Sequence, residues 1–205
     1  MLMDAAVRIL ARSGLHEMFV VDVLSEAGLS TRSFYRHFES KNDLLRALVL
    51  RETESVAQSL ERAIDRAAGP AAAVDAWLDG LLDAIFEPKR AARAALFMTP
   101  AVRTAYPMAD RMVDTHWTLS RPLAEVLRAG HEAGFLVSPN PEADAVSMFA
   151  LVGITAYVPH ANLRNRAAVR AQVVRFSWPT LGLSADTAAT QGPRRPRRTR
   201  RTATR

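Results

Sequence analysis

Residues 27–41 read Ala-Gly-Leu-Ser-Thr-Arg-Ser-Phe-Tyr-Arg-His-Phe-Glu-Ser-Lys, a pattern typical of a tight turn between two crossing helices. Gly28 can adopt a positive φ without a Cβ clash. Leu29 can fill the angle between the helices, and Ser30 can cap the second one by accepting from its free N–H groups. The stretch therefore predicts a helix-turn-helix.

The helix after Ser30 has one apolar and one polar side. Phe34 and Phe38 stand four residues apart and can face a core. The rest of the circumference carries hydrogen-bonding groups from Thr31, Arg32, Ser33, Tyr35, Arg36 and His37. Such groups suit the base edges and phosphates of DNA, but an ordinary solvated helix has the same pattern, so the chemistry alone leaves both interpretations open.

A second helix start follows at once. Ser40 and Asp43 form a capping-box pattern ahead of an apolar run that includes Leu44 and Leu48. Lys41 would lie at this helix start, where free N–H groups and a cation together favour a phosphate.

The composition is that of a folded, cysteine-free protein. The chain has 205 residues, 49% of them hydrophobic, which is enough for a substantial core. The lack of cysteine excludes disulfides and thiolate chemistry. The sequence shows neither a signal-peptide pattern nor a membrane-spanning apolar run, so we expect a cytoplasmic protein with no membrane partner.

The net charge of +6 is concentrated at the carboxyl end. Seven arginines and no acidic residue follow Gly192, so the rest of the chain is close to neutral, and residues 1–48 carry equal numbers of basic and acidic side chains. DNA binding would therefore depend on where the charges lie. The arginine-rich tail could add salt-sensitive affinity for phosphates or could be a solubilising extension.

Apolar periodicity and Gly, Pro and Ser signals predict helices throughout, with no strand. The expected ranges are about 2–13, 20–26, 31–38, 41–68, 71–86, 89–98, 108–133, 142–158 and 166–178. Pro122 should kink or break the helix over 108–133 near residues 119–121. We expect three regions: a helix-turn-helix domain over 1–48, a helical domain over 49–183 and a disordered tail over 184–205.

Catalytic and metal signatures are missing from the sequence. No two of the five histidines have i, i+4 spacing, and no HExxH motif, GxSxG elbow, phosphate loop or dinucleotide-binding glycine pattern occurs. The sequence therefore predicts no metal, no cofactor and no enzymatic activity.

From Ala5 to about Leu48 the chain resembles the amino-terminal domain of TetR-family transcriptional regulators. The matching residues are Ala5-Ala6, Ile9-Leu10, Gly14, Asp22-Val23, residues 27–30, residues 34–38, Lys41 and Leu44-Leu45. The resemblance implies an all-α protein in which a three-helix helix-turn-helix DNA-binding domain precedes a helical ligand-binding and dimerisation domain. It also implies a ligand-responsive repressor that binds a palindromic double-stranded DNA operator as a homodimer.

The sequence departs from the family pattern at two places near its start. Phe19 stands where a threonine usually caps the second helix and touches phosphate, so that contact and the stability of the helix are in doubt. A hydrophobic residue there could instead act as a staple against Val23 or pack on the first helix. Many relatives carry a basic arm before the first helix that can enter the minor groove, and because the given sequence shows none, we expect either that this contact is absent or that the true start lies upstream.

The expected DNA contacts are assigned from the chemistry of the side chains on the helix after Ser30 and at the start of the next helix. We expect base contacts from Thr31, Arg32 and Arg36, and phosphate contacts from Ser33, Tyr35, His37 and Lys41.

The carboxyl-terminal domain should hold a small-molecule effector, largely apolar, whose identity the sequence does not give. Candidate pocket residues are Trp77, Phe86, Phe97, Met108, Met112, His116, Trp117, Met148 and Phe149. His116 lies on an otherwise apolar stripe and could anchor such a ligand, although such side chains more often serve in ordinary core packing. Candidate dimer-interface residues are Phe149, Gly153, Ala156, Val173 and Val174, and their burial within one chain is the alternative.

Two other functional classes stay open on the sequence. One is a helical small-molecule-binding or enzymatic domain without specific DNA binding, suggested by Phe19 and by the neutral charge of residues 1–48. The other is a general DNA-coating protein driven by the arginine-rich tail.

Overall fold

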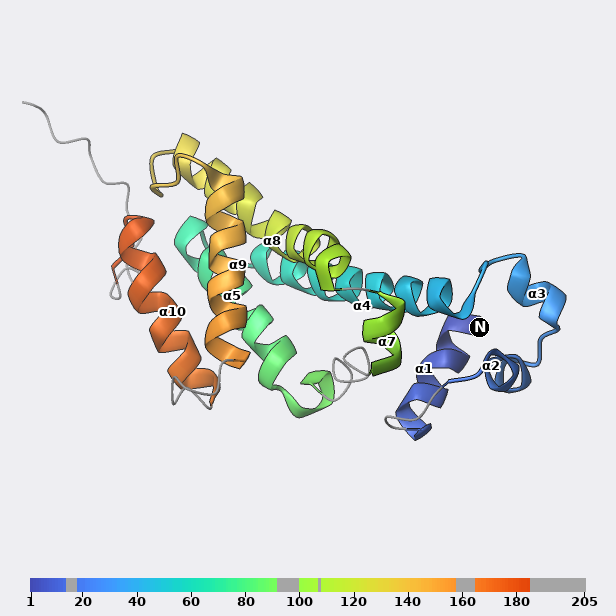
Figure 1. Ribbon diagram of the computed structural model, residues 1–205. Coiled ribbons are helices and arrows are strands. Elements are labelled where there is room, and N and C mark those ends of the chain that lie inside the picture. The colour runs from blue at the N-terminus through green and yellow to red at the C-terminus, as the bar shows by residue number, and fades with distance from the viewer. Residues whose placement is uncertain (14–17, 92–99, 107, 158–164, 185–205) are drawn as a thin grey trace, which may run out of the picture.

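The computed structural model describes residues 1–13, 18–91, 100–106, 108–157 and 165–184. Within these ranges the chain is helical with no strand, which confirms the all-α prediction (Figure 1). The helices are α1 (Leu2–Ser13), α2 (Val20–Ala27), α3 (Thr31–Tyr35), α4 (Lys41–Ile64), α5 (Pro70–Phe86), α7 (Pro100–Ala105), α8 (Met108–Glu132), α9 (Pro141–Tyr157) and α10 (Arg166–Thr180). The tail predicted to be disordered lies outside the described residues, apart from Ser184.

The buried side chains form two separate clusters, and α4 contributes to both. The first cluster joins α1, α2 and α3 to the first turns of α4, where Leu44, Leu45 and Leu48 are buried. The second joins Ala57 and Leu60 of α4 to α5, α8, α9 and α10. Figure 1 shows α4 running from the group formed by α1, α2 and α3 to the other helices. One continuous helix therefore connects the two cores.

The amino-terminal core is completed by residues from far along the chain. Val102 of α7 and Tyr106 just after it are almost fully buried among the apolar side chains of α1 to α4. Residues 1–48 therefore supply most of the first core but not all of it.

Local capping signals explain where several helices begin. At α4, the Ser40 side chain accepts a hydrogen bond from the backbone N–H of Asp43 at 3.1 Å, and the Asp43 carboxylate accepts one from the N–H of Glu39 at 3.2 Å. Asn165 caps α10 by accepting from the N–H of Ala168 at 2.9 Å. Because these signals depend only on near neighbours in sequence, the starts predicted for α4 and α10 agree with the structure, whereas α7 lies in a stretch predicted to be an irregular link.

Of the kink or break predicted near residues 119–121, a break does not occur, because α8 continues through Pro122. Pro122 cannot donate to the carbonyl one turn earlier, but side chains bond to nearby carbonyls. Ser120 Oγ donates to the His116 carbonyl at 2.6 Å, and the buried Trp77 Nε1 donates to the Leu119 carbonyl at 2.9 Å. These bonds tie the turn before the proline to itself and to α5.

No helix in the described part of the chain combines the length and apolar character that a membrane crossing needs. No group of three or more histidine or carboxylate side chains there is arranged to hold a metal ion.

Candidate nucleic-acid interface

The turn between α2 and α3 has the geometry expected from its sequence. Gly28 has φ 63° and ψ 35°, in the left-handed region, and ends α2. The N–H of Leu29 donates to the Leu24 carbonyl at 3.0 Å, which closes the last turn of α2. Ser30 then caps α3, because its Oγ accepts from the N–H of Ser33 at 3.3 Å. An alanine at position 28 would meet no steric obstacle but would have to hold a strained φ.

Aromatic packing holds α3 against the amino-terminal core. The Phe34 side chain is fully buried, and its ring centroid lies 5.7 Å from that of Phe38, which is partly buried against the same core. The assigned helix ends at Tyr35, earlier than expected, but the N–H groups of Arg36 and Phe38 still bond to carbonyls four residues back. The helical course therefore continues far enough to keep both phenylalanines on one side.

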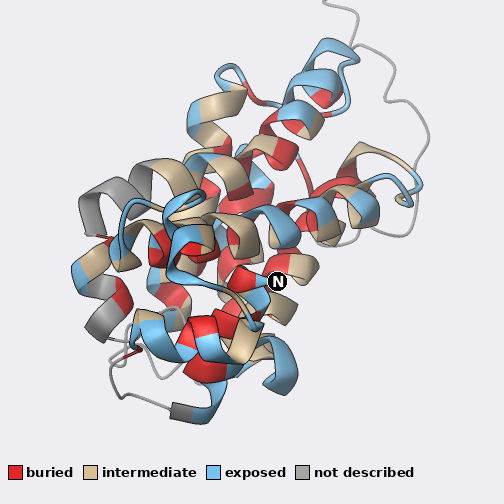
Figure 2. Cartoon of the chain, turned by 90° about the vertical axis from the view of Figure 1, so that its right-hand side faces the viewer, coloured by how far each residue is buried: buried red, intermediate tan, exposed pale blue. Residues whose placement is uncertain are grey.

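The opposite side of this helix points into solvent. Thr31, Arg32, Tyr35, Arg36 and His37 are exposed, and Tyr35 keeps 61% of its surface accessible. Ser33 is half-buried, with its hydroxyl 3.2 Å from that of Ser30. Figure 2 views this end of the molecule and shows exposed residues on the outer faces of its helices and buried residues between them.

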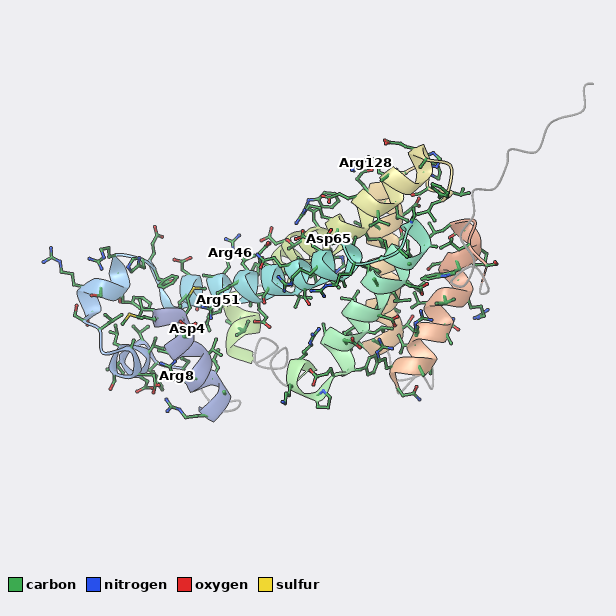
Figure 3. All side chains as sticks on the ribbon, turned by 180° about the vertical axis from the view of Figure 1, so that it is seen from behind. Asp4, Arg8, Arg46, Arg51, Asp65 and Arg128 are labelled. Carbon is green, nitrogen blue, oxygen red and sulfur yellow. The ribbon has the colours of Figure 1, made fainter. Side chains whose placement is uncertain are left out.

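Ion pairing explains how a nearly neutral domain can present a positive helix. Arg8 and Arg12 pair with Glu26, and Arg51 pairs with Asp4 at 2.8 Å, as Figure 3 shows for the facing side chains of Arg51 and Asp4. The pKa values of Glu26 and Asp4 are lowered, for Glu26 chiefly by hydrogen bonds from the two arginines. In the described part of the chain no carboxylate pairs with the arginines of the exposed helix face, Arg32 and Arg36. The exposed face of α3 therefore keeps two free cations.

Lys41 occupies the first position of α4 and is half-buried. Its neighbourhood is less open to an anion than the sequence suggested. The Ser40 side chain already takes the N–H of Asp43, and the Asp43 carboxylate lies in the same first turn. A phosphate at this helix start would use the Lys41 side chain and the remaining first-turn N–H groups.

Phe19 precedes α2 as its N-cap residue without a capping hydrogen bond, and 54% of its surface is exposed. The neighbouring Met18 is fully buried in the same core as Val23, the fourth residue of α2. Met18 therefore occupies the position of a hydrophobic staple, rather than Phe19 as the sequence suggested.

Restoring a cap at position 19 should stabilise the domain. We expect Phe19→Thr to be about 0.5–1 kcal/mol more stable than Phe19→Ala, because a threonine hydroxyl can accept from a first-turn N–H of α2 that has no side-chain partner. This difference corresponds to roughly 1–4 °C in melting temperature. Thermal and urea denaturation of both variants and the wild type would measure it, and equal stability of the two variants would contradict the assignment of position 19 as the cap.

The candidate ligand-pocket residues are only partly brought together. His116 is half-buried, and its ring centroid lies 4.8 Å from that of Phe149 in an edge-on arrangement. Burial lowers the pKa of His116, so the ring is neutral at physiological pH and can donate or accept a hydrogen bond. Met148 is buried in the second core, and Phe86 is partly buried against it.

Other members of that set have different surroundings. Trp77 is fully buried and donates its ring N–H to the Leu119 carbonyl, whereas Trp117 is 45% exposed. Phe97 and the side chains of Met108 and Met112 lie outside the described residues.

The candidate dimer-interface residues divide between surface and core. Gly153 has no atom within 4 Å of where a Cβ would stand. Ala156, Phe149 and Val174 are partly buried against the second core, and Val173 is fully buried within it. Sequence reasoning missed the most exposed apolar side chains of the same two helices, which are Ile154 and Tyr157 of α9 and Phe176 of α10.

Comparison with known proteins agrees with this architecture. Residues 2–48 match the model of bacterial regulatory proteins of the tetR family. No curated protein matches the chain significantly. Among solved structures, the transcriptional regulator FadR from Bacillus subtilis in complex with stearoyl-CoA is similar, with a TM-score of 0.63, 17% identity, and coverage of 88% of this chain and 97% of that one.

Two further solved structures share the fold. A regulatory protein in the tetR family from Rhodococcus RHA1 has a TM-score of 0.54 at 20% identity, over 89% of this chain and 96% of that one. The TetR-family transcriptional regulator PfmR from Thermus thermophilus has a TM-score of 0.53 at 18% identity, over 84% and 94%. Residues 2–48 of this chain thus match the tetR family of bacterial regulatory proteins, and the chain as a whole has the fold of solved members of that family.

Proposed function

We propose that the protein is a ligand-responsive transcriptional repressor that binds a palindromic DNA operator as a homodimer. The observation that carries this proposal is the exposed face of α3, which combines two unpaired arginines with hydroxyl, phenol and imidazole groups while Phe34 anchors the other side. A short helix presented in this way can enter the major groove, where arginine reads guanine through two hydrogen bonds.

Each exposed side chain has an assigned role in this proposal. Thr31, Arg32 and Arg36 contact base edges. The phosphate contacts come from Ser33, Tyr35, His37 and Lys41, which flank them in the sequence. The arginine-rich tail, which lies outside the described residues, could add affinity that does not depend on sequence.

Selection of bound sequences from a random DNA pool tests the proposal. We expect the purified protein to enrich a palindrome whose half-sites are about one helical turn, roughly 34–36 Å, apart. Enrichment of no sequence at moderate salt would reject operator binding. It would favour either a small-molecule-binding domain without specific DNA binding or a general DNA-coating protein.

The proposed dimer uses the outer faces of α9 and α10. Ile154 is 64% exposed and Tyr157 is 68% exposed, three residues apart on one side of α9. Phe176 of α10 is also exposed, and the lack of a side chain at Gly153 permits close approach of a second helix. Two such helix pairs can form a four-helix bundle across a two-fold axis. Val173 has no free surface for such a contact, because it is fully buried in its own chain.

A charge on this surface should prevent dimerisation. We expect Ile154→Asp to shift the protein from dimer to monomer, because each copy would then bury an unpaired carboxylate in an apolar interface. Analytical ultracentrifugation over a range of concentrations would measure the change. Val21→Asp is the matched control, since Val21 is 68% exposed but belongs to α2. An Ile154→Asp protein that stays dimeric would reject this interface.

A polar junction links the two cores close to the proposed ligand region. The Tyr106 hydroxyl donates to the Asp114 carboxylate of α8, and Arg46 Nη2 of α4 lies 3.4 Å from the same carboxylate. The Arg46 guanidinium also stands over the Tyr106 ring, 5.3 Å from its centroid. His116 follows Asp114 by two residues on α8. A ligand that moves this part of α8 would therefore act on α4 and on the core that holds α3.

The same junction gives a measurable contribution to stability. Burial, together with donation to Asp114, raises the pKa of Tyr106 to about 12, so the phenol stays a neutral donor at physiological pH. We expect Tyr106→Phe to lower the free energy of unfolding by about 0.5–1.5 kcal/mol, because the ring is kept and one hydrogen bond is lost. Urea denaturation would measure this change, with Tyr35→Phe as an exposed control that should change stability little. Equal effects at the two positions would show that the bond to Asp114 adds nothing to the junction.

A further inference from the structure

A cleft of about 310 Å³ lies between α4 and α5, and none of the candidate ligand-pocket residues lines it. Its α4 side consists of Glu52, Ser55, Val56, Ser59 and Arg62, whose spacing places them on one face of the helix. The other lining residues are Gly80 and Ala84 of α5, and Arg90 beyond it. The space exists because small side chains line both helices, and its volume is within the range of small-molecule sites.

The two serines offer hydroxyl groups to this space. In the described part of the chain no hydrogen bond engages either the Ser55 or the Ser59 side chain. By contrast, the Thr118 hydroxyl of α8 is already engaged, because its Oγ1 donates to the Asp114 carbonyl at 2.7 Å. The cleft therefore presents two donors, one helical turn apart, that a bound molecule can use.

The two arginines of the cleft, Arg62 and Arg90, have little pairing with described carboxylates. Arg62 is exposed, and no acidic side chain among the residues that the structure describes pairs with it. The nearest carboxylate oxygen to the Arg90 guanidinium belongs to Glu87, at 3.9 Å, and Glu87 also accepts hydrogen bonds from the backbone N–H groups of Lys89 and Arg90. By contrast, carboxylates pair with Arg8, Arg12, Arg46, Arg51, Arg121, Arg128, Arg166 and Arg170.

The remaining lining residues define the rest of the ligand. Val56 and Ala84 give the cleft an apolar wall, and Val56 packs against the second core. Glu52 is the single carboxylate of the described lining, and it lies ten residues, or about 15 Å, along α4 from Arg62. An anionic group at the Arg62 end would therefore meet hydroxyl and guanidinium donors, with the acidic residue at the far end.

We propose that this cleft binds a small organic anion, in which a carboxylate or phosphate is carried on a short apolar body. Arg62 and Ser59 hold the anionic group, Ser55 supplies a further donor, and the apolar body lies against Val56 and Ala84. The site is separate from the neighbourhood of His116, and its occupation does not require that the protein bind DNA.

Isothermal titration calorimetry on the full chain without DNA tests the site with three probes of one shape. Benzoate and phenyl phosphate carry the anionic group on a phenyl ring, and benzyl alcohol is the neutral match. We expect both anions to bind with a stoichiometry of one per chain and the alcohol to bind at least about tenfold more weakly, because it has no negative charge to pair with the Arg62 guanidinium.

Variants locate the binding. Arg62→Ala should weaken benzoate binding by about tenfold or more. Arg66→Ala removes the same charge from an exposed position just beyond the end of α4, outside the cleft lining, and should leave binding unchanged. Ser59→Asp supplies a second variant, because a carboxylate in the cleft would repel the anion, and circular dichroism would confirm that each variant is folded.

Three results would overturn the proposal. They are equal losses in Arg62→Ala and Arg66→Ala, unchanged benzoate binding in folded Ser59→Asp, and binding of benzyl alcohol as tight as that of benzoate. Loss of binding in Arg62→Ala and Ser59→Asp alone supports it, whether or not the protein selects an operator.

Discussion

Phe34→Ala is expected to lower the free energy of unfolding by about 3–5 kcal/mol and to abolish sequence-specific DNA binding. Phe34 is fully buried, so its removal leaves a cavity in the amino-terminal core as well as losing the transfer energy of the ring. The same ring holds α3 in place, because it contacts Tyr35 edge-on at 5.3 Å and Phe38 at 5.7 Å. A helix without this anchor cannot hold its exposed side chains at fixed positions against a groove.

Two denaturation curves and one binding curve separate the effects. Urea unfolding gives the stability of Phe34→Ala, and a fluorescence titration with the selected operator gives its affinity at a temperature where the variant is folded. Tyr35→Ala is the matched control, since Tyr35 is exposed and its loss should change stability by less than about 1 kcal/mol while weakening DNA binding. Full DNA affinity in folded Phe34→Ala would show that α3 is not the recognition helix.

Features that depend on near neighbours in the chain could be predicted from the sequence. The turn after α2 needs a residue with positive φ and then a cap, and Gly28 and Ser30 meet these needs within three positions. Likewise, Pro70 begins α5 immediately after the turn that ends α4. Signals of this kind act through contacts between residues that are close in sequence, so the all-α fold and most helix bounds could be predicted from them.

Features that depend on partners distant in sequence could not be predicted in this way. Tyr106 lies outside every helix predicted from the sequence. It is nevertheless buried in the amino-terminal core, and most of its neighbours there are more than fifty residues away in sequence. Pro122 reads as a helix breaker, but the Trp77 side chain bonds to the Leu119 carbonyl from another helix and the turn is preserved. Long-range packing decided both cases, and nothing in the local pattern indicates it.

The charge of the candidate site is another feature that could not be predicted from residues 1–48, because it depends on which charged side chains pair. Counting side chains gives a neutral domain and suggests weak attraction to DNA. In the structure, the acidic side chains Asp4 and Glu26 are engaged by arginines of α1 and α4, away from α3. The count is correct, but the pairing leaves Arg32 and Arg36 without described acidic partners.

Arg36→Ala is expected to weaken binding to the selected operator by about 1–3 kcal/mol, roughly fivefold to 150-fold, and to relax the preference at one base pair of each half-site. The reason is that a guanidinium in the major groove makes two hydrogen bonds to one guanine, and alanine makes none. Arg36 is exposed and caps the end of α3, so its replacement should leave the fold intact.

Comparing two DNA series distinguishes base reading from simple charge attraction. The affinity of wild-type and Arg36→Ala protein is measured on the operator and on variants substituted at each position. Arg66→Ala is a charge-matched control, because Arg66 lies just beyond the end of α4 that is distant from α3. If Arg36 reads a base, the variant loses discrimination at one position only. If it contacts only phosphate, affinity falls equally on every sequence and the salt dependence becomes shallower, because fewer counterions are released. Equal loss on all sequences would therefore move Arg36 from base recognition to backbone contact and leave Thr31 and Arg32 as the groove-reading side chains.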